Sequence, residues 1–312
     1  MKKLIIALSF IMLLLCSCGE PSTDNEKINI VATMFPQYDF ARNIAGENAD
    51  VELLLDFGAD SHSYEPTPAD IVKIAGADLF IYTGGEMELW AAKLLESADV
   101  KKAVEGGTLH MLDLSEYVEL IPMHEHEHDH EDGHGHEEYD THIWTSPSNA
   151  QKMCEAIAAT LTELDESNTD TYAAGLAAYT DKLNALGEKM TEVADSAALD
   201  TIYFGGSFAF RYLFDEIGLA HVSIYEGCAS HAEPSAADIA KMVDEIKASG
   251  AKYVVYDSPS EKKIAESIAA ESGAEVLHLH AIHNITKAEF DAGEDYISLM
   301  EKNIETLGKA LA

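Results

Sequence analysis

Positive charge is scarce in this sequence. Its 312 residues contain 20 lysines and arginines against 56 aspartates and glutamates, which gives a formal net charge of −36 at pH 7. Such a charge repels nucleic acids and anionic membrane surfaces, and it attracts cations. The composition therefore predicts no nucleic-acid partner. It is compatible with a cationic ligand, although an acidic surface also serves solubility alone.

Long apolar runs are missing after the N-terminus, so no interior segment is predicted to cross a membrane. The start, MKKLIIALSFIMLLLCSCGE, has two lysines, an apolar run and then small residues. This order is typical of a secretory signal, and the run is too short for a membrane helix. The residues LCSC resemble a bacterial lipobox. We therefore predict that residues 1–17 are a signal peptide, that Cys18 is lipidated and that 18–27 is a flexible tether. The alternative is a plain secreted protein.

Cysteine is also rare. Apart from the pair in the lipobox, the chain has only Cys154 and Cys228, which can form one disulfide in an oxidising compartment or none. No CxxC is present, so a thiolate zinc site is not expected. The motif GxSxG and a Walker loop are absent as well, which argues against the enzyme classes that carry them. The spacing HExxH occurs only inside the acidic His-rich run at 124–134, which has no apolar periodicity to predict the helix that a zinc protease motif needs.

Strand and helix signals alternate along the rest of the chain. Strands are expected at 27–35, 51–56, 77–84 and 107–115, and again at 201–206, 220–227, 252–258 and 275–283. All but the strand at 107–115, which the His-rich run follows, precede a segment with helical spacing. This alternation predicts parallel sheets with helices on both faces. Residues 87–98 read as an amphipathic helix with an imperfect apolar face.

The middle of the chain carries two helices, at 146–165 and 169–197. The second has a stripe of apolar residues at spacings of 4 and 3 over nearly thirty residues, about 40 Å if unbroken. We expect an α/β fold of two parallel-sheet lobes joined by this long helix. The predicted parts are a first lobe at 28–147, linking helices at 148–198 and a second lobe at 199–312. Loops from both lobes would meet in a cleft at the carboxyl ends of the strands.

Six histidines crowd into HEHEHDHEDGHGH, inside a stretch at 122–140 that we predict to be a disordered loop because it has no apolar periodicity. Alternating imidazole and carboxylate groups offer many weak metal sites that exchange quickly and concentrate metal locally. We expect the loop to scavenge metal, or to sense its abundance; the alternative is a solvated acidic spacer. The candidate ligands are His124, His126, His128, His130, His134 and His136.

The other histidines fall into two groups. His110, His221 and His231 are expected to be structural. His62 follows a strand in a loop rich in Gly, Asp, Ser and Pro, and His142 lies between the His-rich run and a capped helix. His278, His280 and His283 lie on or after the last strand, with His278 and His280 on the same side of it.

Several of these segments together are similar to a known family. GADSHSYEPTPADIVKIAGADLFIYTGGEMELW, the acidic His-rich insertion, THIWTSPSNA and YISLMEKNIETL resemble the zinc- and manganese-binding lipoproteins of bacterial ABC importers, in the same order, from about residue 28 to the end. The resemblance implies two α/β lobes bridged by a long helix, with one metal in the interlobe cleft. It also implies a monomer that hands its metal to a membrane permease.

The same resemblance suggests the ligands. His62 and His142 occupy two family positions, and His280 lies where the family often has a carboxylate. Ser207 stands where the family usually has a histidine, so the remaining ligand is open. His283, Glu226, Cys228 and a water molecule are the candidates for it.

The donor set favours zinc. Neutral imidazole suits borderline cations, whereas oxygen ligands favour harder ions such as Mn²⁺. Copper and nickel remain compatible. Because protons compete for imidazole, we expect the affinity to fall below about pH 6. We predict a binding protein rather than an enzyme. The alternatives are a secreted zinc-dependent hydrolase and a metal-binding surface adhesin.

Overall fold

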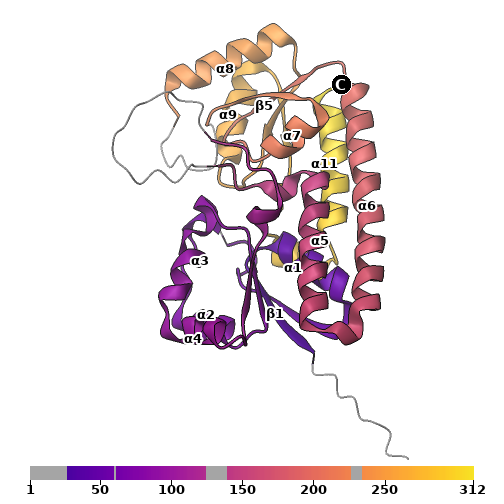
Figure 1. The fold of residues 1–312 in the computed structure, drawn as a ribbon. Helices are drawn as coiled ribbons and strands as arrows, with labels where there is room; N and C mark the ends of the chain where they lie inside the picture. Colours follow the sequence, from indigo (N-terminus) through magenta and orange to yellow (C-terminus); the bar gives the residue numbers. More distant parts are fainter. Residues whose placement is uncertain (1–26, 60, 124–138, 226–233) are drawn as a thin grey trace, which may run out of the picture.

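The protein is described by a computed structural model, in which two α/β lobes lie beside a long helix (Figure 1). The structure describes residues 27–59, 61–123, 139–225 and 234–312, except for the side chains of His62, Glu86 and Ala92. The predicted signal peptide, the lipidation site Cys18 and the tether up to residue 26 lie outside these ranges. None of the helices in them combines the length and the apolar character that crossing a membrane requires.

Each lobe is built on a four-stranded parallel sheet. The first sheet has the order β2-β1-β3-β4 and the second the order β6-β5-β7-β8, so the two lobes repeat one topology. The strands are β1 (Ile28–Ala32), β2 (Ala49–Leu53), β3 (Leu79–Tyr82), β4 (His110–Asp113), β5 (Thr201–Phe204), β6 (Ala220–Ser223), β7 (Tyr253–Tyr256) and β8 (Glu275–His278). The predicted fold class, two parallel-sheet lobes with a long helix, is confirmed.

Helices follow most of the strands. They are α1 (Phe35–Ala45), α2 (Pro68–Ala75), α3 (Leu89–Lys93), α4 (Ala98–Glu105), α5 (Pro147–Leu164), α6 (Thr169–Asp195), α7 (Arg211–Ile217), α8 (Ala236–Ser249), α9 (Lys262–Ser272), α10 (Lys287–Asp291) and α11 (Tyr296–Ala310). Short 3₁₀ turns include η2 (Ser61–Ser63), η3 (Glu86–Glu88), η4 (Leu94–Glu96) and η6 (Ile143–Thr145). Ser146 caps α5 through its hydroxyl, as its position in the sequence predicts.

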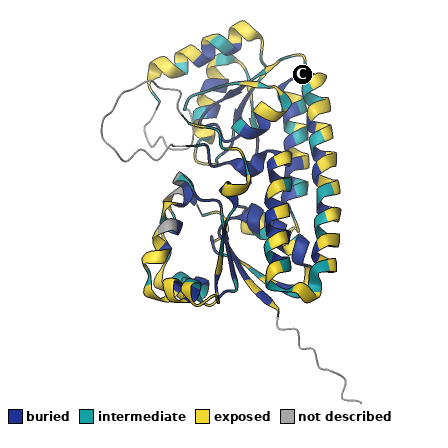
Figure 2. Ribbon diagram, viewed as in Figure 1, coloured by how far each residue is buried: buried dark blue, intermediate teal, exposed yellow. Residues whose placement is uncertain are grey.

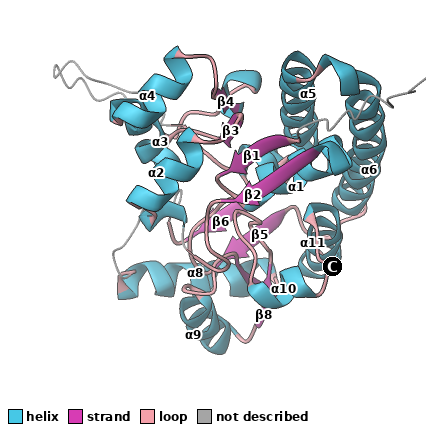
Figure 3. Cartoon of the chain, turned by 90° about the horizontal axis from the view of Figure 1, so that it is seen from below, coloured by secondary structure: helices cyan, strands magenta, loops and turns pink. Residues whose placement is uncertain are grey.

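Alternate residues of the central strands enter different cores. In β1, Ile30 and Ala32 pack with α1, α5 and α6, whereas Val31 faces a second core under α2, α3 and α4. Figure 3 shows these two groups of helices on opposite sides of the first sheet. The core beside α1 and α6 continues without a break into the second lobe, where it takes in Phe204 of β5. Figure 2 shows the buried positions of both lobes lining this shared interior.

The helix α6 spans both lobes, as the apolar stripe predicts. It has 27 residues, a length of about 40 Å at 1.5 Å per residue. The stripe residues that it buries are Tyr172, Tyr179, Leu183, Leu186 and Met190. It packs against α1 and α5 of the first lobe and against α11 at the C-terminus. The predicted lobe boundaries stay a prediction.

Two expectations about single elements were wrong. Residues 87–98 form no continuous helix: α3 has five residues and passes into the turn η4, and α4 begins only at Ala98. Leu89 and Leu95, which belong to the expected apolar face, are exposed, so these residues do not form one packed helical face. The last strand ends at His278 instead of reaching His283, since the chain then turns to run between the lobes.

Candidate metal centre

The His62 loop leaves the carboxyl end of β2 and contains the 3₁₀ turn η2. Its backbone is bound by the second lobe: the Asn284 amide donates to the carbonyl oxygens of Asp56 and Ala59, at 2.8 and 2.9 Å. The Gly58 N–H in turn donates to the Ile285 carbonyl. The loop is therefore held against the segment that follows β8. The side chain of His62 lies outside what the structure describes.

His142 is held by a carboxylate two residues away. Its Nδ1 lies 2.8 Å from Oδ1 of Asp140, the same oxygen that accepts the His142 backbone N–H, and both side chains are buried. Burial by itself raises the pKa of Asp140, but the His142 charge and hydrogen bonds outweigh it and hold that pKa below its usual value. When Nδ1 carries the shared proton, the lone pair of the neutral ring lies on Nε2, which is the nitrogen that can bind a metal.

The His142 segment is bound to the second lobe on both sides. The Tyr212 hydroxyl of α7 donates to the Asp140 carbonyl at 2.6 Å, and the Trp144 indole N–H donates to the Ala281 carbonyl at 2.8 Å. Tyr296, at the start of α11, donates to the Trp144 carbonyl. The imidazole of His142 is thereby fixed near the carboxyl ends of the second sheet.

The ends of the His-rich run meet close to His142. Pro122 and Tyr139 form an antiparallel bridge, and the Asp140 N–H donates to the Ile121 carbonyl. The Arg211 guanidinium donates to the Pro122 carbonyl. The expected disordered loop at 122–140 is therefore too wide at both ends. The six histidines from His124 to His136 lie outside the described residues.

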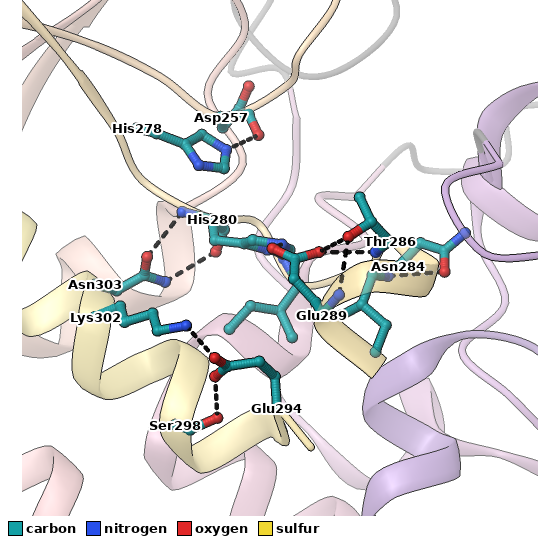
Figure 4. Close-up of polar contacts among 12 residues, drawn as sticks. Asp257, His278, His280, Asn284, Thr286, Glu289, Glu294, Ser298, Lys302 and Asn303 are labelled. Atoms are coloured by element: carbon teal, nitrogen blue, oxygen red, sulfur yellow. Dashed lines mark hydrogen bonds and ion pairs between the residues drawn. The ribbon is translucent and has the colours of Figure 1, made fainter. Parts of the chain in front are cut away.

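The candidate ligand His280 contacts α10 and α11 (Figure 4). Its backbone N–H and carbonyl both form hydrogen bonds with the side-chain amide of Asn303. In its ring, Nδ1 accepts the Ile282 N–H at 2.9 Å, and Nε2 lies 3.6 Å from Oε1 of Glu289. Hydrogen bonding to His280 lowers the pKa of Glu289 to about 2. The neutral ring thus carries its proton on Nε2, the opposite tautomer to that of His142. A metal at Nε2 would have to replace that proton.

His283 belongs to the stretch that crosses toward the first lobe. Its carbonyl accepts the Phe35 N–H at 3.2 Å, and Asn284 beside it holds the His62 loop. Ile282 just before it has φ of 62°, which is rare and strained for a β-branched residue. The strained residue lies between His280 and Asn284, the residue that contacts the His62 loop of the first lobe.

The remaining histidines have other surroundings. His278 stacks on Tyr256, with ring centroids 4.8 Å apart, and its ring centroid is 5.4 Å from that of His280, as their shared side predicts. Burial, then the charge of His280, lowers the pKa of His278.

His221 stacks on Phe208, and His110 at the start of β4 is exposed. Cys154 is buried and forms no disulfide. Glu226, Cys228 and His231 lie outside the described residues.

Glu88 is a buried carboxyl of the first lobe that the sequence analysis missed. Its Oε2 accepts the N–H groups of Thr83 and Gly84, at the carboxyl end of β3. Burial raises the pKa of Glu88 to about 7. The turn that it holds continues through Gly85, where φ is 68° and a Cβ atom would lie 2.4 Å from Cγ2 of Thr141. Glu88 therefore supports the residue next to His142.

Carboxyl groups also gather at the second sheet. Ser207 follows β5, and its N–H and hydroxyl both donate to Oε1 of Glu261, at 3.0 and 2.7 Å. Asp257 directly follows β7 and is buried. Sequence reasoning missed Asp140, Asp257 and Glu261. Only the spacing in Asp-Thr-His offered a signal, because a carboxylate two residues from a histidine can orient its ring.

Across the described residues, no three His, Cys, Asp or Glu side chains form a ready metal site. The geometry brings the His62 loop, the His142 segment and residues 280–285 together at the facing edges of the two sheets. A binding protein of two α/β lobes joined by a long helix is the class that this fold defines.

Comparison with known proteins gives the family. The family described as "Zinc-uptake complex component A periplasmic" matches residues 30–310, and the chain belongs to it. It is 35% identical to the zinc-binding lipoprotein AdcA of Streptococcus pneumoniae over 309 residues, which cover 98% of this chain and 60% of that protein. It is also 35% identical to the high-affinity zinc uptake system protein ZnuA of Bacillus subtilis, over 96% of this chain and 94% of that one.

A solved structure supports the same assignment. The crystal structure of the Zn(II)-bound ZnuA-like domain of S. pneumoniae AdcA is similar with a TM-score of 0.76 and 31% identity, covering 91% of this chain and 99% of that one. This chain spans about 60% of the length of the AdcA lipoprotein that it matches. The resemblance drawn from the sequence is confirmed.

Proposed function

We propose that this chain captures a divalent transition metal outside the cytoplasm, Zn²⁺ by preference, and delivers it to the membrane permease of an ABC importer. The observation that carries the proposal is the buried Asp140–His142 pair, fixed between the lobes in a member of a zinc-uptake family. A carboxylate behind an imidazole is the usual support of a zinc-binding histidine.

The proposed ligands are His62 and His142 from the first lobe and His280 from the second, with His283 as the alternative to His280. Asn284 supports this choice of segment, because it ties residues 280–285 to the His62 loop.

Anchoring and location follow from the N-terminus. We propose that Cys18 carries the lipid and holds a monomer on the outer side of the membrane, where the permease is its partner. AdcA, a relative, is named a lipoprotein. Cys18→Ala should release the protein into the soluble fraction, whereas Cys154→Ala should not.

The His-rich run is proposed to collect metal beside the site. Its two ends are joined at Pro122 and Tyr139, close to His142, so metal released from the run would start near the cleft. Deleting residues 124–138 should abolish the weak sites and leave one tight site with its affinity unchanged. Loss of the tight site in this variant would contradict the division of roles.

The main experiment is metal analysis of protein purified without chelators, with zinc titration of four variants. His62→Ala and His142→Ala should each weaken zinc binding roughly 100-fold or more, as expected for loss of a direct ligand. His280→Ala and His283→Ala decide between the two candidates. The matched control is His110→Ala, an exposed histidine on β4. Unchanged zinc binding in the His62 and His142 variants would overturn the proposal.

Two other functions are separated by simple assays. A zinc-dependent hydrolase would turn over esters, peptides or phosphates, and its activity would fall in His142→Ala. An adhesin would bind host protein even as the metal-free His62→Ala variant. Transport predicts neither result, and it predicts zinc-limited growth when the chain is deleted.

A further inference from the structure

The second lobe presents carboxyl groups where the proposed site needs a donor. Ser207 follows β5 and Asp257 follows β7, and these strands are neighbours in the centre of the sheet. Because the carboxyl ends of parallel strands lie at one edge, the two residues lie side by side. Glu261, directly before α9, joins them.

The turn after β5 is shaped to hold Glu261. Ser207 gives two hydrogen bonds to Oε1, one from its N–H and one from its hydroxyl. At Gly206, a Cβ atom would lie 2.2 Å from Oε2 of the same carboxyl group, so any side chain there would displace that carboxyl group. The glycine and the serine therefore fix one carboxylate at the edge of the sheet.

Asp257 is the group that this arrangement leaves unexplained. It is 6% exposed, and its Oδ1 has no hydrogen-bond partner among the described residues; Oε2 of Glu261 is in the same condition. Buried carboxyl oxygens without donors are costly in a folded protein. Burial, then the charge of Glu261 and a hydrogen bond between the two carboxyl groups, raises the pKa of Asp257, so the two buried acids share a proton at an energetic cost.

Asp257 lies beside the histidines at the end of β8. Its carbonyl oxygen is 3.3 Å from Nε2 of His278, and the ring centroid of His278 is 5.4 Å from that of His280. The charge of His142 is among the influences that lower the pKa of Asp257. His142 comes from the first lobe and Asp257 from the second. A divalent cation between them would satisfy the open carboxyl oxygen and balance the two acidic charges.

We propose that Asp257 is a direct metal ligand supplied by the second lobe, and that Ser207 and Glu261 position it. This inference rests on the proposed function, and it assigns the donor that the sequence left open at Ser207. The resulting site combines imidazole nitrogen with carboxylate oxygen. Oxygen donors suit harder cations, so this site should discriminate less between Zn²⁺ and Mn²⁺ than a site of imidazoles alone.

The test compares Asp257→Asn, Glu261→Gln and Ser207→Ala in the full chain, by zinc and manganese titration. The Asp257 variant should lose roughly 100-fold in zinc affinity, and the two positioning variants roughly 10-fold each. The matched control is Glu266→Gln on α9, where the carboxylate pairs with Lys262 in solvent. Asp257→Glu, which keeps a carboxylate, should bind within tenfold of the parent.

Folding and ligation are measured separately. The metal-free Asp257→Asn protein should melt at or above the parent temperature, because the substitution removes a buried repulsion. X-ray absorption at the zinc edge of the parent protein should give fewer imidazoles, counted from the outer-shell scattering of their rings, than first-shell N/O ligands. Asp257→Asn should change the first shell while keeping the imidazole count. A parent spectrum in which every first-shell ligand is an imidazole overturns the inference, even if Asp257→Asn fails to fold.

The outcomes distinguish the two proposals. If His142→Ala loses zinc while Asp257→Asn binds as the parent does, the carboxylate ligand is wrong and the transport function stands. If neither affects zinc binding, the proposed function itself fails.

Discussion

The two lobes repeat one strand order, yet their facing edges carry different chemistry. The first edge presents an imidazole, His142, which Asp140 orients and which hydrogen bonds from the second lobe hold in place. The second edge presents carboxyl groups, Asp257 and Glu261, arranged around Ser207. One topology can therefore serve as a platform for either nitrogen or oxygen donors, because the loops rather than the sheets determine the ligands.

The buried acids of the two lobes sharpen the contrast. Glu88 of the first lobe gives one oxygen to two backbone N–H groups and so stabilises its own turn. Each acid leaves one oxygen, Oε1 of Glu88 and Oδ1 of Asp257, without a hydrogen-bond partner among the described residues, but Asp257 is paired with a second acid, Glu261. We therefore assign a structural role to the first carboxyl group and a binding role to the second.

The largest expected effect is that of metal removal. If zinc joins the two edges, an excess of 1,000 times the dissociation constant should stabilise the fold by about 4 kcal/mol. Calorimetry with zinc and with chelator measures this. Amide hydrogen exchange should show new protection at both edges, around His142 and around Ser207. Protection in the first lobe alone would break the comparison.

The next effect concerns Glu88 and pH. Its pKa of about 7 lies above its ordinary value of 4.5, so between these pH values the folded state keeps a proton that the unfolded state releases. Its contribution is complete below pH 4.5 and is lost as the pH rises through 7, by about 3 kcal/mol. Glu88→Gln should remove this slope from urea unfolding of the metal-free protein.

The control for Glu88 is Glu47→Gln, an exposed carboxylate on the same lobe, which should leave the slope as it is. A parent protein whose stability relative to Glu88→Gln stays constant from pH 4.5 to 8 would show that Glu88 keeps an ordinary pKa.

A smaller effect is expected at Gly85. In Gly85→Ala the new methyl group meets Thr141 at 2.4 Å and the backbone has positive φ. Gly107→Ala has similar φ, 72°, with no atom within 4 Å, so it measures the backbone strain alone. We expect Gly85→Ala to be less stable than Gly107→Ala by about 1–3 kcal/mol, by urea unfolding, and to bind zinc more weakly. Equal stability would mean that the turn does not support the His142 segment.

The smallest expected effect is at Asp140. Asp140→Asn keeps the shape of the side chain and removes its charge, so the His142 ring should lose its fixed tautomer. Zinc affinity should fall by about 10–100-fold, as for other residues that orient a ligand. Competition titration with a chromophoric chelator measures it, and Asp165→Asn, remote at the end of α5, is the control. A change below twofold would mean that backbone contacts alone orient the ring.

Much of the fold follows from local patterns. The stripe from Tyr172 to Val193 predicted α6 because a helix that packs along its length needs an apolar face of that period. The break after Lys93 was not predicted, since short 3₁₀ turns have no strong sequence signal. The site was harder: Asp257 and Glu261 belong to it only because two strands end side by side, and no spacing in the sequence records that.

The bridge between Pro122 and Tyr139 has a consequence for how such a chain can vary. The Asp140 N–H also donates to the Ile121 carbonyl, so the two ends of the insertion are paired directly before the carboxylate that orients His142. Residues can be added or removed between Pro122 and Tyr139 without shifting the His142 imidazole. If the insertion collects metal as proposed, its capacity and the affinity of the site at His142 can therefore evolve independently.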